Sequence, residues 1–388
     1  MKTLRDAAIE NKTVLLRADF NVTVSRGAVT EDFRMRAALP TIQYVLTHGA
    51  KKVLVISHFG RPAEGKPNSA FSLAPVGRHL SSLLNKEIDF VDDCIGENVR
   101  SRIKESKKRV IVLENLRFYK GEEENDTQFA KSLAALGDIF VQDAFGAAHR
   151  AHASIVGVPK FLPSYAGFLF EKEVRWLSSV LKNPVRPLAA LIGGAKISTK
   201  MPVIEKFLKF ADNVCLGGAL ANTVLKAKGV AVGKSLVEEE MVEKMKNFEY
   251  TDARLHLPVD IKVAKDKDAA DGISIKGVGN VGDEELILDI GPDTQDLFSN
   301  IVHRSKTIIW NGPMGYLENK RFAEGTRRIA KELGNVPPHV CTIVGGGDTY
   351  LTLADVGVMD RISFVSTGGG AMLDFLAKGT LPGIEALG

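Results

Sequence analysis

The sequence of 388 residues has few cysteines, few aromatic residues and no long apolar run. Its three cysteines, Cys94, Cys215 and Cys341, are far apart and odd in number, so they predict neither a disulfide framework nor a CxxC metal site. No apolar stretch approaches the roughly 20 residues that span a bilayer. Residues 1–10 lack the apolar segment of a signal peptide. We therefore expect a cytoplasmic protein with no membrane partner.

Aromatic residues make up only 7% of the chain and are not interleaved with clusters of Lys and Arg, so no nucleic-acid partner is expected. Residues 1–170 hold 24 Lys and Arg against 19 Asp and Glu, a balance of +5. Residues 171–388 hold 27 against 28, a balance of −1. This surplus favours an anionic ligand in the first half, although a mildly basic solvated surface is the commoner explanation of a small excess.

Short apolar runs alternate with longer helical patterns along most of the chain. The clearest predicted strands are residues 14–20, 53–58, 110–113 and 139–143, followed by residues 188–192, 213–216, 307–310, 340–344 and 362–365. Continuous apolar strands separated by helices predict parallel sheets that are buried on both faces. Two such series predict an α/β protein with two doubly wound, Rossmann-like parallel-sheet domains.

The boundary between the two predicted domains should fall near residues 170–185. Residues 170–182 have helical periodicity, and Asn183-Pro184 then ends the helix. We expect an N-terminal domain over residues 1–170, a hinge helix over residues 171–184 and a C-terminal domain over residues 185–378. A long helix that simply packs on one domain is an equally good interpretation.

Arginine-rich polar residues follow the strands of the first half, where ligands of open α/β sheets bind. The candidates are Asp19, Asn21, Arg34, His58, Arg61, Arg117 and Arg150. The planar arginine fork suits a carboxylate or a phosphate. Any one of these arginines alone is more often a surface salt-bridge partner, but several at one sheet edge favour a small polyanion. His58 and His149 are either phosphate donors or structural residues.

Glycine-rich segments follow the strands of the second half, at residues 193–194, 217–218, 345–347 and 368–370. Without side chains, backbone N–H groups can approach phosphate oxygens, whereas a tight turn explains three consecutive glycines poorly. Asp348 is a candidate Mg²⁺ ligand, with N-capping by Asp348 or Thr349 as the alternative. Lys196 and Lys200 would share one face if their segment were helical, which suits a phosphate chain; two solvated lysines are the alternative.

Three other patterns are weak. Residues 277–282 match GxGxxG, but a strand-like run at residues 286–290 follows instead of a helix, which argues against an NAD-dependent dehydrogenase. Residues 229–235 resemble a Walker A loop that is one residue too short. His149 and His152 lack further metal ligands nearby. A non-catalytic phosphate-binding scaffold is a further alternative, which the two lysines and Asp348 disfavour.

Eight segments in chain order resemble the phosphoglycerate kinase family, from about residue 14 to the C-terminus. They are residues 16–22, 57–62, 113–118, 144–152, 193–200, 310–315, 345–349 and 366–371. Two positions depart from the family pattern: Thr23 stands where proline is usual, and Leu317 replaces an aromatic residue before Glu318. Neither change removes a charged group.

The resemblance implies reversible phosphoryl transfer between 1,3-bisphosphoglycerate and ADP, which gives 3-phosphoglycerate and ATP with Mg²⁺. It implies that the N-terminal domain binds phosphoglycerate through Asp19, Asn21, Arg34, His58, Arg61, Arg117 and Arg150. It also implies that the C-terminal domain binds the nucleotide, with Glu318 on the ribose and Asp348 on the metal. The nucleotide set is Lys200, Gly217, Gly218, Asn311, Glu318, Gly346, Gly347, Asp348 and Thr349.

The chemistry needs no general base, because the reacting carboxylate is already ionised at neutral pH. It needs alignment and charge neutralisation around the transferred group. Our catalytic candidates are Arg34, Lys196, Lys200 and Gly369. The resemblance further implies that domain closure joins the two substrates and that a tail at about residues 379–388 returns to the N-terminal domain. We expect a monomer.

Overall fold

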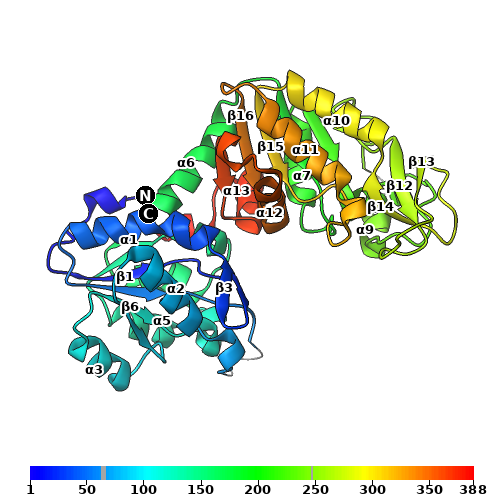
Figure 1. Cartoon of the computed structure of the whole chain (residues 1–388). Coiled ribbons are helices and arrows are strands. Elements are labelled where there is room, and N and C mark those ends of the chain that lie inside the picture. Colours follow the sequence, from blue (N-terminus) through cyan, green and yellow to red (C-terminus); the bar gives the residue numbers. More distant parts are fainter. Residues whose placement is uncertain (63–66, 246–247) are drawn as a thin grey trace. The chain divides into compact units, whose positions relative to one another are not determined.

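A computed structural model describes residues 1–62, 67–245 and 248–388. The chain divides into two compact units, Met1–Leu177 with Lys378–Gly388, and Ser178–Ala377. Figure 1 shows helices alongside the strands in both of them. Within the described ranges, no helix combines the length and the apolar character needed to cross a bilayer.

The first unit is built on a six-stranded sheet in the order β5-β6-β4-β1-β7-β8, and every neighbouring pair is parallel. Its strands are β1 (Thr13–Arg17), β4 (Lys52–Ile56), β5 (Asp89–Val91), β6 (Val110–Leu113), β7 (Ile139–Gln142) and β8 (Ser164–Ala166). A short hairpin is formed by β2 (Thr23–Ser25) and β3 (Ala28–Glu31). The helices are α1 (Phe33–Thr47), α2 (Ala74–Leu84), α3 (Glu97–Glu105), α4 (Lys120–Glu123), α5 (Thr127–Ala134), α6 (Phe168–Lys182) and α14 (Pro382–Glu385).

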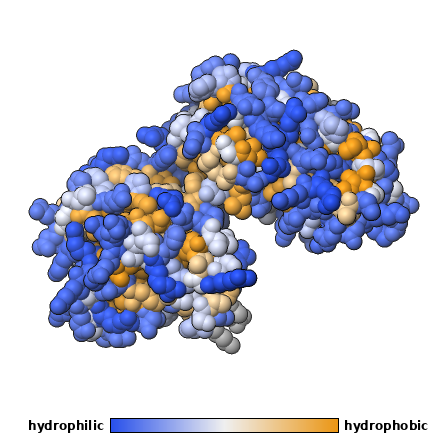
Figure 2. All heavy atoms as spheres, viewed as in Figure 1, coloured by the Kyte–Doolittle hydropathy of each residue, from blue (hydrophilic) through white to orange (hydrophobic). Residues whose placement is uncertain are grey.

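Helices cover both faces of this sheet because successive side chains of a strand point to opposite sides. Val14 and Leu16 of β1 join one apolar cluster with side chains of α1 and α2. Leu15 joins a second cluster with side chains of α3 and α5. The strands are therefore apolar on both faces, and Figure 2 shows mainly hydrophilic residues on the visible surface of each unit.

The second unit contains a six-stranded parallel sheet in the order β11-β10-β9-β15-β16-β17. Its strands are β9 (Leu188–Ile192), β10 (Asn213–Leu216), β11 (Leu255–His256), β15 (Thr307–Asn311), β16 (Cys341–Gly345) and β17 (Phe364–Ser366). The helices are α7 (Met201–Phe210), α8 (Gly218–Ala227), α9 (Glu239–Lys244), α10 (Pro292–Arg304), α11 (Glu324–Asn335), α12 (Gly347–Val356) and α13 (Gly370–Lys378). The predicted class, with two doubly wound parallel-sheet domains, is confirmed.

A second, antiparallel sheet of the second unit was not expected. It has the order β13-β12-β14, formed by β12 (Asp260–Ala264), β13 (Ser274–Gly277) and β14 (Leu286–Ile290). The GxGxxG segment at residues 277–282 lies between β13 and β14, so it leads from one strand to another. It lacks the strand–turn–helix setting of a dinucleotide fingerprint, as the sequence suggested.

The helix α6 contains the position at which the two units divide, between Leu177 and Ser178. The C-terminal segment Lys378–Gly388 belongs to the first unit. There, the backbone N–H of Gly383 donates to the carbonyl of Ala148 at 2.9 Å. An added Cβ at Gly383 would lie 3.0 Å from Ala148 Cβ, so the segment packs closely on the loop after β7.

One local prediction was wrong, and the condition attached to another is not met. The first predicted strand, residues 14–20, ends at Arg17, because the following residues leave the sheet and form loop contacts. Lys196 and Lys200 do not share a helical face, because α7 begins only at Met201. Pro202 lies in the first turn of α7, where its missing N–H costs no helical hydrogen bond, and Lys200 is the N-cap residue.

Candidate functional site

Four neighbouring strands of the first sheet, β6, β4, β1 and β7, end at the same edge because all of them are parallel. The loop after each strand carries polar residues that the sequence singled out. Asp19 and Asn21 follow β1, and His58 follows β4. Arg117 and Arg150 follow β6 and β7. The topology therefore brings together side chains that are far apart in the sequence.

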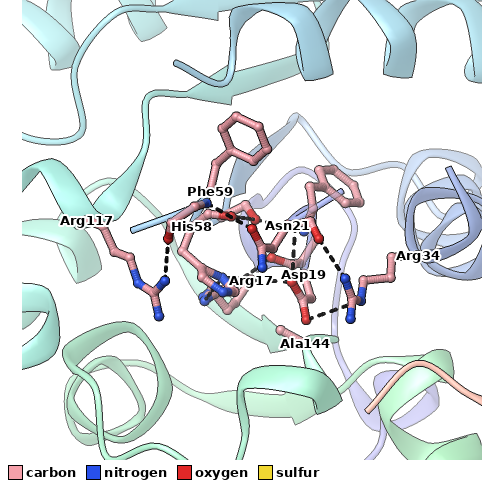
Figure 3. Close-up of polar contacts among 12 residues, drawn as sticks. Arg17, Asp19, Asn21, Arg34, His58, Phe59, Arg117 and Ala144 are labelled. Carbon is pink, nitrogen blue, oxygen red and sulfur yellow. Dashed lines mark hydrogen bonds and ion pairs between the residues drawn. The ribbon is translucent and has the colours of Figure 1, made fainter. Parts of the chain in front are cut away.

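Buried polar groups form the centre of this edge, as Figure 3 shows. His58 is 6% exposed, and its Nδ1 atom lies 3.1 Å from the Nη2 atom of Arg17. Asp19 is 7% exposed, and its Oδ1 atom accepts from the backbone N–H of Asn21 at 3.2 Å. The side-chain oxygen of Asn21 accepts from the N–H of Gly60 at 2.8 Å, which joins the loops after β1 and β4.

Arg34, in the first turn of α1, extends toward the same loop (Figure 3). Its Nη1 atom donates to the carbonyl of Asn21 at 2.6 Å, and its Nε atom lies 3.8 Å from Oδ2 of Asp19. The Arg34 side chain is 29% exposed, while Asp19 is almost fully buried. The carboxylate thus orients an arginine whose other side is accessible to solvent.

The arginines at this edge are close enough to affect one another electrostatically. Burial and the positive charges of Arg150, Arg17 and Arg61 together lower the pKa of Arg117 to about 10, against the opposing negative charge of Glu123. Burial and the positive charges of Arg17, Arg117 and Arg150 also lower the pKa of His58 well below its usual value. An unneutralised positive potential of this kind favours an anion.

Arg17 is the main residue that sequence reasoning missed here. It lies inside the segment 16–22 that carried the resemblance, yet as the last residue of β1 it read as part of a strand. Arg17 is fully buried, and burial lowers the pKa of its guanidinium. A charged residue at the end of an otherwise apolar strand is the signal that would have identified it.

A cavity of about 1240 Å³ lies within the second unit. It is lined by the residues after β9, β10, β15 and β16 on one side and by β14 and the segment 316–318 on another. Of the predicted nucleotide set, the residues that line it are Lys200, Gly218, Asn311, Glu318, Gly346, Gly347, Asp348 and Thr349. Gly217, Lys196 and Gly369 are not among the described residues that line the cavity.

Glycines permit the close approach of three backbone segments at this cavity. Gly218 has a φ of +67°, and an added Cβ would lie 2.7 Å from both the Gly194 nitrogen and the Pro313 oxygen. An added Cβ at Gly312 would lie 2.3 Å from the carbonyl oxygen of Gly193. No other residue type fits at Gly218 or Gly312 without moving backbone.

Lys200 reaches this glycine cluster from the N-terminus of α7. Its Nζ atom donates to the carbonyl of Gly193, and an added Cβ at Gly194 would lie 2.5 Å from Nζ. Burial lowers the pKa of Lys200 to about 8, while the negative charge of Asp348 raises it. Lys196, by contrast, is exposed, and its charge acts on Glu238.

The segment 344–349 leads from β16 into α12, and residues 365–370 lead from β17 into α13, as predicted. Gly346 is the N-cap residue of α12, with a φ of 105° and no side-chain capping bond. The hydroxyl of Thr349 donates to the carbonyl of Gly345 at 2.7 Å, so neither Thr349 nor Asp348 caps α12. An added Cβ at Gly369 would lie 4.0 Å from Gly346 Cα, so the two glycine turns are neighbours.

Comparisons with known proteins identify the family. The family model of phosphoglycerate kinase matches residues 4–379. The chain belongs to the phosphoglycerate kinase family. It is 46% identical to the phosphoglycerate kinase of Trichodesmium erythraeum over 391 residues, covering 99% of this chain and 98% of that protein. This makes it a kinase, a phosphotransferase with a carboxyl group as acceptor.

Solved phosphoglycerate kinase structures share the fold. The structure from Coxiella burnetii has a TM-score of 0.82 and 41% identity, covering 99% of this chain and 98% of that one. The structure from Pyrococcus horikoshii has a TM-score of 0.85 and 33% identity, covering 100% and 98%. The activity of the family is reversible phosphoryl transfer between 1,3-bisphosphoglycerate and ADP.

The donor set around Asp348 fits the magnesium ion of such a kinase. Asp348 is exposed in the cavity, and its carboxylate is the kind of ligand that Mg²⁺ takes together with substrate phosphates and water. The described residues contain no group of three or more His, Cys, Asp and Glu side chains able to hold a metal. A single carboxylate would leave the other positions of a magnesium ion to phosphate oxygens and water.

Proposed function

We propose that the edge of the first sheet binds 3-phosphoglycerate and 1,3-bisphosphoglycerate. The supporting observation is the convergence of Arg17, Arg117 and Arg150 at this edge, where the positive charge of Arg150 lowers the pKa of both Arg17 and Arg117. The proposed binding residues are Asp19, Asn21, Arg34, His58, Arg61, Arg117 and Arg150. Arginine forks bind the phosphate and carboxylate groups bidentately, while Asp19 orients Arg34.

The cavity of the second unit is proposed to bind ADP and ATP. Lys200 contributes a partly buried positive charge, and the glycine turns at residues 217–218 and 346–347 let backbone N–H groups approach phosphate oxygens. Glu318 is exposed in the cavity lining and is proposed to meet the ribose hydroxyls. Asp348 would hold Mg²⁺, which neutralises charge on the nucleotide phosphates when bound.

Four residues are proposed to stabilise the transferring phosphoryl group: Arg34, Lys196, Lys200 and Gly369. The first three supply positive charge, and Gly369 supplies a backbone N–H beside the turn of Gly346. Their preorganised charges and dipoles act without a general base, because the attacking carboxylate is already ionised. The monomeric state, the cytoplasmic location and bending at α6 stay predictions.

Two variants of the full-length protein, each titrated with both ligands, test the assignment of one ligand to each unit. Calorimetry would compare Arg61→Ala and Asp348→Asn, each titrated with 3-phosphoglycerate and with Mg-ADP. Arg61→Ala should weaken 3-phosphoglycerate binding about tenfold, because a charge-assisted contact is lost, and should leave Mg-ADP binding within twofold. Asp348→Asn should do the reverse.

Matched controls are an exposed arginine on α2, Arg78→Ala, and an exposed carboxylate outside the cavity lining, Asp360→Asn. Neither control should change either affinity by more than twofold. A loss of nucleotide affinity in Arg61→Ala, with 3-phosphoglycerate binding intact, would contradict the assignment of the two ligands to the two units.

A further inference from the structure

Three buried, hydrogen-bonded polar side chains lie next to the proposed phosphoglycerate site, and none of them belongs to the proposed set of binding residues. Glu122 of α4, Ser154 of the helical turn η6 (Ala153–Gly157) and Arg17 of β1 all have 0% exposure. They come from three separate elements, and 137 residues separate Arg17 from Ser154. Burying a carboxylate and a guanidinium is costly unless every donor and acceptor is satisfied, so a fully connected series here requires an explanation.

In the hydrogen bonds among these three side chains, Arg17 donates to Ser154 and Ser154 donates to Glu122. Ser154 donates its hydroxyl proton to Oε1 of Glu122 at 2.6 Å, and its backbone N–H donates to Oε2 at 2.9 Å. The Ser154 hydroxyl in turn accepts from Nε of Arg17 at 2.9 Å. Each oxygen of the Glu122 carboxylate thereby accepts one hydrogen bond from Ser154, and the hydroxyl proton points to Oε1.

Arg17 links this series of hydrogen-bonded side chains to His58. Nη2 of Arg17 lies 3.1 Å from Nδ1 of His58, and a guanidinium can only donate. Nδ1 must therefore be the unprotonated ring nitrogen, which leaves the proton of the neutral ring on Nε2. The hydrogen bonds recorded for the described residues use only Nδ1 of this ring.

We propose that Glu122 is a positioning residue that acts through Ser154 and Arg17 to hold His58 as the Nε2–H tautomer, a hydrogen-bond donor to the substrate anion. This inference rests on the proposed function of the first unit as the phosphoglycerate site. The neighbouring exposed carboxylates have other partners: Glu123 pairs with Arg117, and Glu124 pairs with Lys120.

The charges around His58 agree with a neutral ring. Burial, together with Arg17, Arg117, Arg150 and His152, lowers the pKa of His58, while Asp19 lies 3.9 Å from Nδ1. His152 faces the other end of this series, with Nδ1 3.9 Å from Oε1 of Glu122, and burial lowers its pKa to about 3. Both histidines are then uncharged at neutral pH, so His58 contributes a directed N–H rather than a charge.

The substitution Glu122→Gln tests this role, because glutamine keeps the size of the side chain but has only one oxygen that can accept a hydrogen bond. If the amide oxygen accepts from the Ser154 N–H, the amide NH₂ faces the Ser154 hydroxyl and leaves its proton without an acceptor. The hydroxyl then turns, its bond with Arg17 weakens, and Arg17 no longer fixes Nδ1 of His58 as an acceptor.

The test measures the His58 tautomer and the kinetics in the same full-length variants. Long-range ¹H–¹⁵N spectra of ¹⁵N-histidine protein distinguish the two ring tautomers, and His58→Gln assigns the signal among the eight histidines. In the wild type, His58 should be neutral and protonated at Nε2 at pH 7. In Glu122→Gln, its ring shifts should move toward a tautomer mixture and KM for 3-phosphoglycerate should rise about tenfold, with KM for ATP and kcat within twofold.

Ser154→Ala is the second variant and should give the same two changes if Glu122→Gln fails to fold. Glu124→Gln, which removes an exposed carboxylate two residues along, should change neither. Ser305→Ala removes a buried hydroxyl of the second unit that donates to Ile301 at 2.7 Å, and it should lower only the thermal midpoint.

A wild-type His58 protonated at Nδ1, or folded Glu122→Gln and Ser154→Ala with unchanged ring shifts and unchanged KM, would overturn this inference alone. If 3-phosphoglycerate leaves the His58 shifts of the wild type unaffected at saturation, the proposed binding site itself is wrong. The two failures are therefore distinguishable in one set of samples.

Discussion

Replacing Lys200 by methionine should make the second unit more stable while it weakens nucleotide binding. Burial lowers the pKa of Lys200 from 10.5 to about 8, which corresponds to about 3 kcal/mol of unfavourable free energy for keeping the ammonium charged in the folded state. Methionine removes this cost and keeps most of the apolar stem. It also loses the hydrogen bond from Nζ to the carbonyl of Gly193, worth about 1 kcal/mol. The net gain at pH 7 should be about 2 kcal/mol.

The pH dependence follows from the same shift. Between about pH 8 and 10.5 the unfolded chain still holds the proton that folded Lys200 has released, so the wild-type free energy of unfolding rises with pH in this window. Below pH 8 both states are protonated, and the full cost is present. The stability advantage of Lys200→Met should therefore be constant from pH 6 to 7.5 and shrink by about 1 kcal/mol by pH 9.

The measurement is urea unfolding of the second unit, followed by the fluorescence of buried Trp310. The chain has two tryptophans, so Trp176→Phe provides a background in which Trp310 is the single reporter. Lys206→Met, an exposed lysine on α7, is the matched control and should stay within about 0.5 kcal/mol of the parent. Calorimetry with Mg-ADP should show affinity at least tenfold lower for Lys200→Met. A variant that is less stable than the parent at pH 7, or whose advantage persists unchanged at pH 9, would refute the reasoning.

Three further predictions concern other parts of the two sites. Arg34→Ala should lower turnover about 10²-fold or more while 3-phosphoglycerate affinity changes much less, and Arg34→Lys should recover only part of the loss because a point charge does not reproduce the fork. Steady-state kinetics with direct binding measurements check this, and a large affinity loss with normal saturated turnover would move Arg34 to the binding set. Gly218→Ala should reduce nucleotide affinity more than tenfold, because its Cβ would meet backbone atoms at 2.7 Å. Calorimetry with ADP measures the affinity, and a circular dichroism spectrum shows whether the variant is folded. Wild-type affinity in the folded variant would show that the glycine turn is not needed. Burial raises the pKa of Asp143 to about 7. Between about pH 4 and 7, folded Asp143 therefore holds a proton that the unfolded chain has lost. The free energy of unfolding should fall as pH rises through this window. Asp143→Asn should flatten that slope in urea titrations of the first unit at pH 5 and 7.5, and an unaltered slope would assign the pH dependence to other groups.

Nine strands of the two parallel sheets could be predicted in chain order from the sequence, whereas the hairpin β2–β3 and the edge strands β5, β8 and β11 were not predicted. Strands buried on both faces are continuous apolar runs, and β6, β9 and β10 have the bounds that their runs predicted. The polar residues that interrupt this pattern after each strand, such as His58 and Arg117, mark the edge at which parallel strands end. The sequence also excluded the dinucleotide fingerprint, since a strand rather than a helix follows residues 277–282.

Tertiary structure alone decided which charged groups are buried together. Glu122 and Ser154 carry no signal in the sequence, and Arg17 is marked only by its place at the end of an apolar strand. These three residues lie in different elements, and only packing removes all of them from water. The two lysines at 196 and 200 have the same residue type and a helical spacing, yet one is exposed and the other donates to Gly193 inside the cavity. Protonation state and electrostatic role depend on desolvation and on charges brought within a few ångströms by distant segments, and neither quantity is encoded in the spacing of residues along the chain.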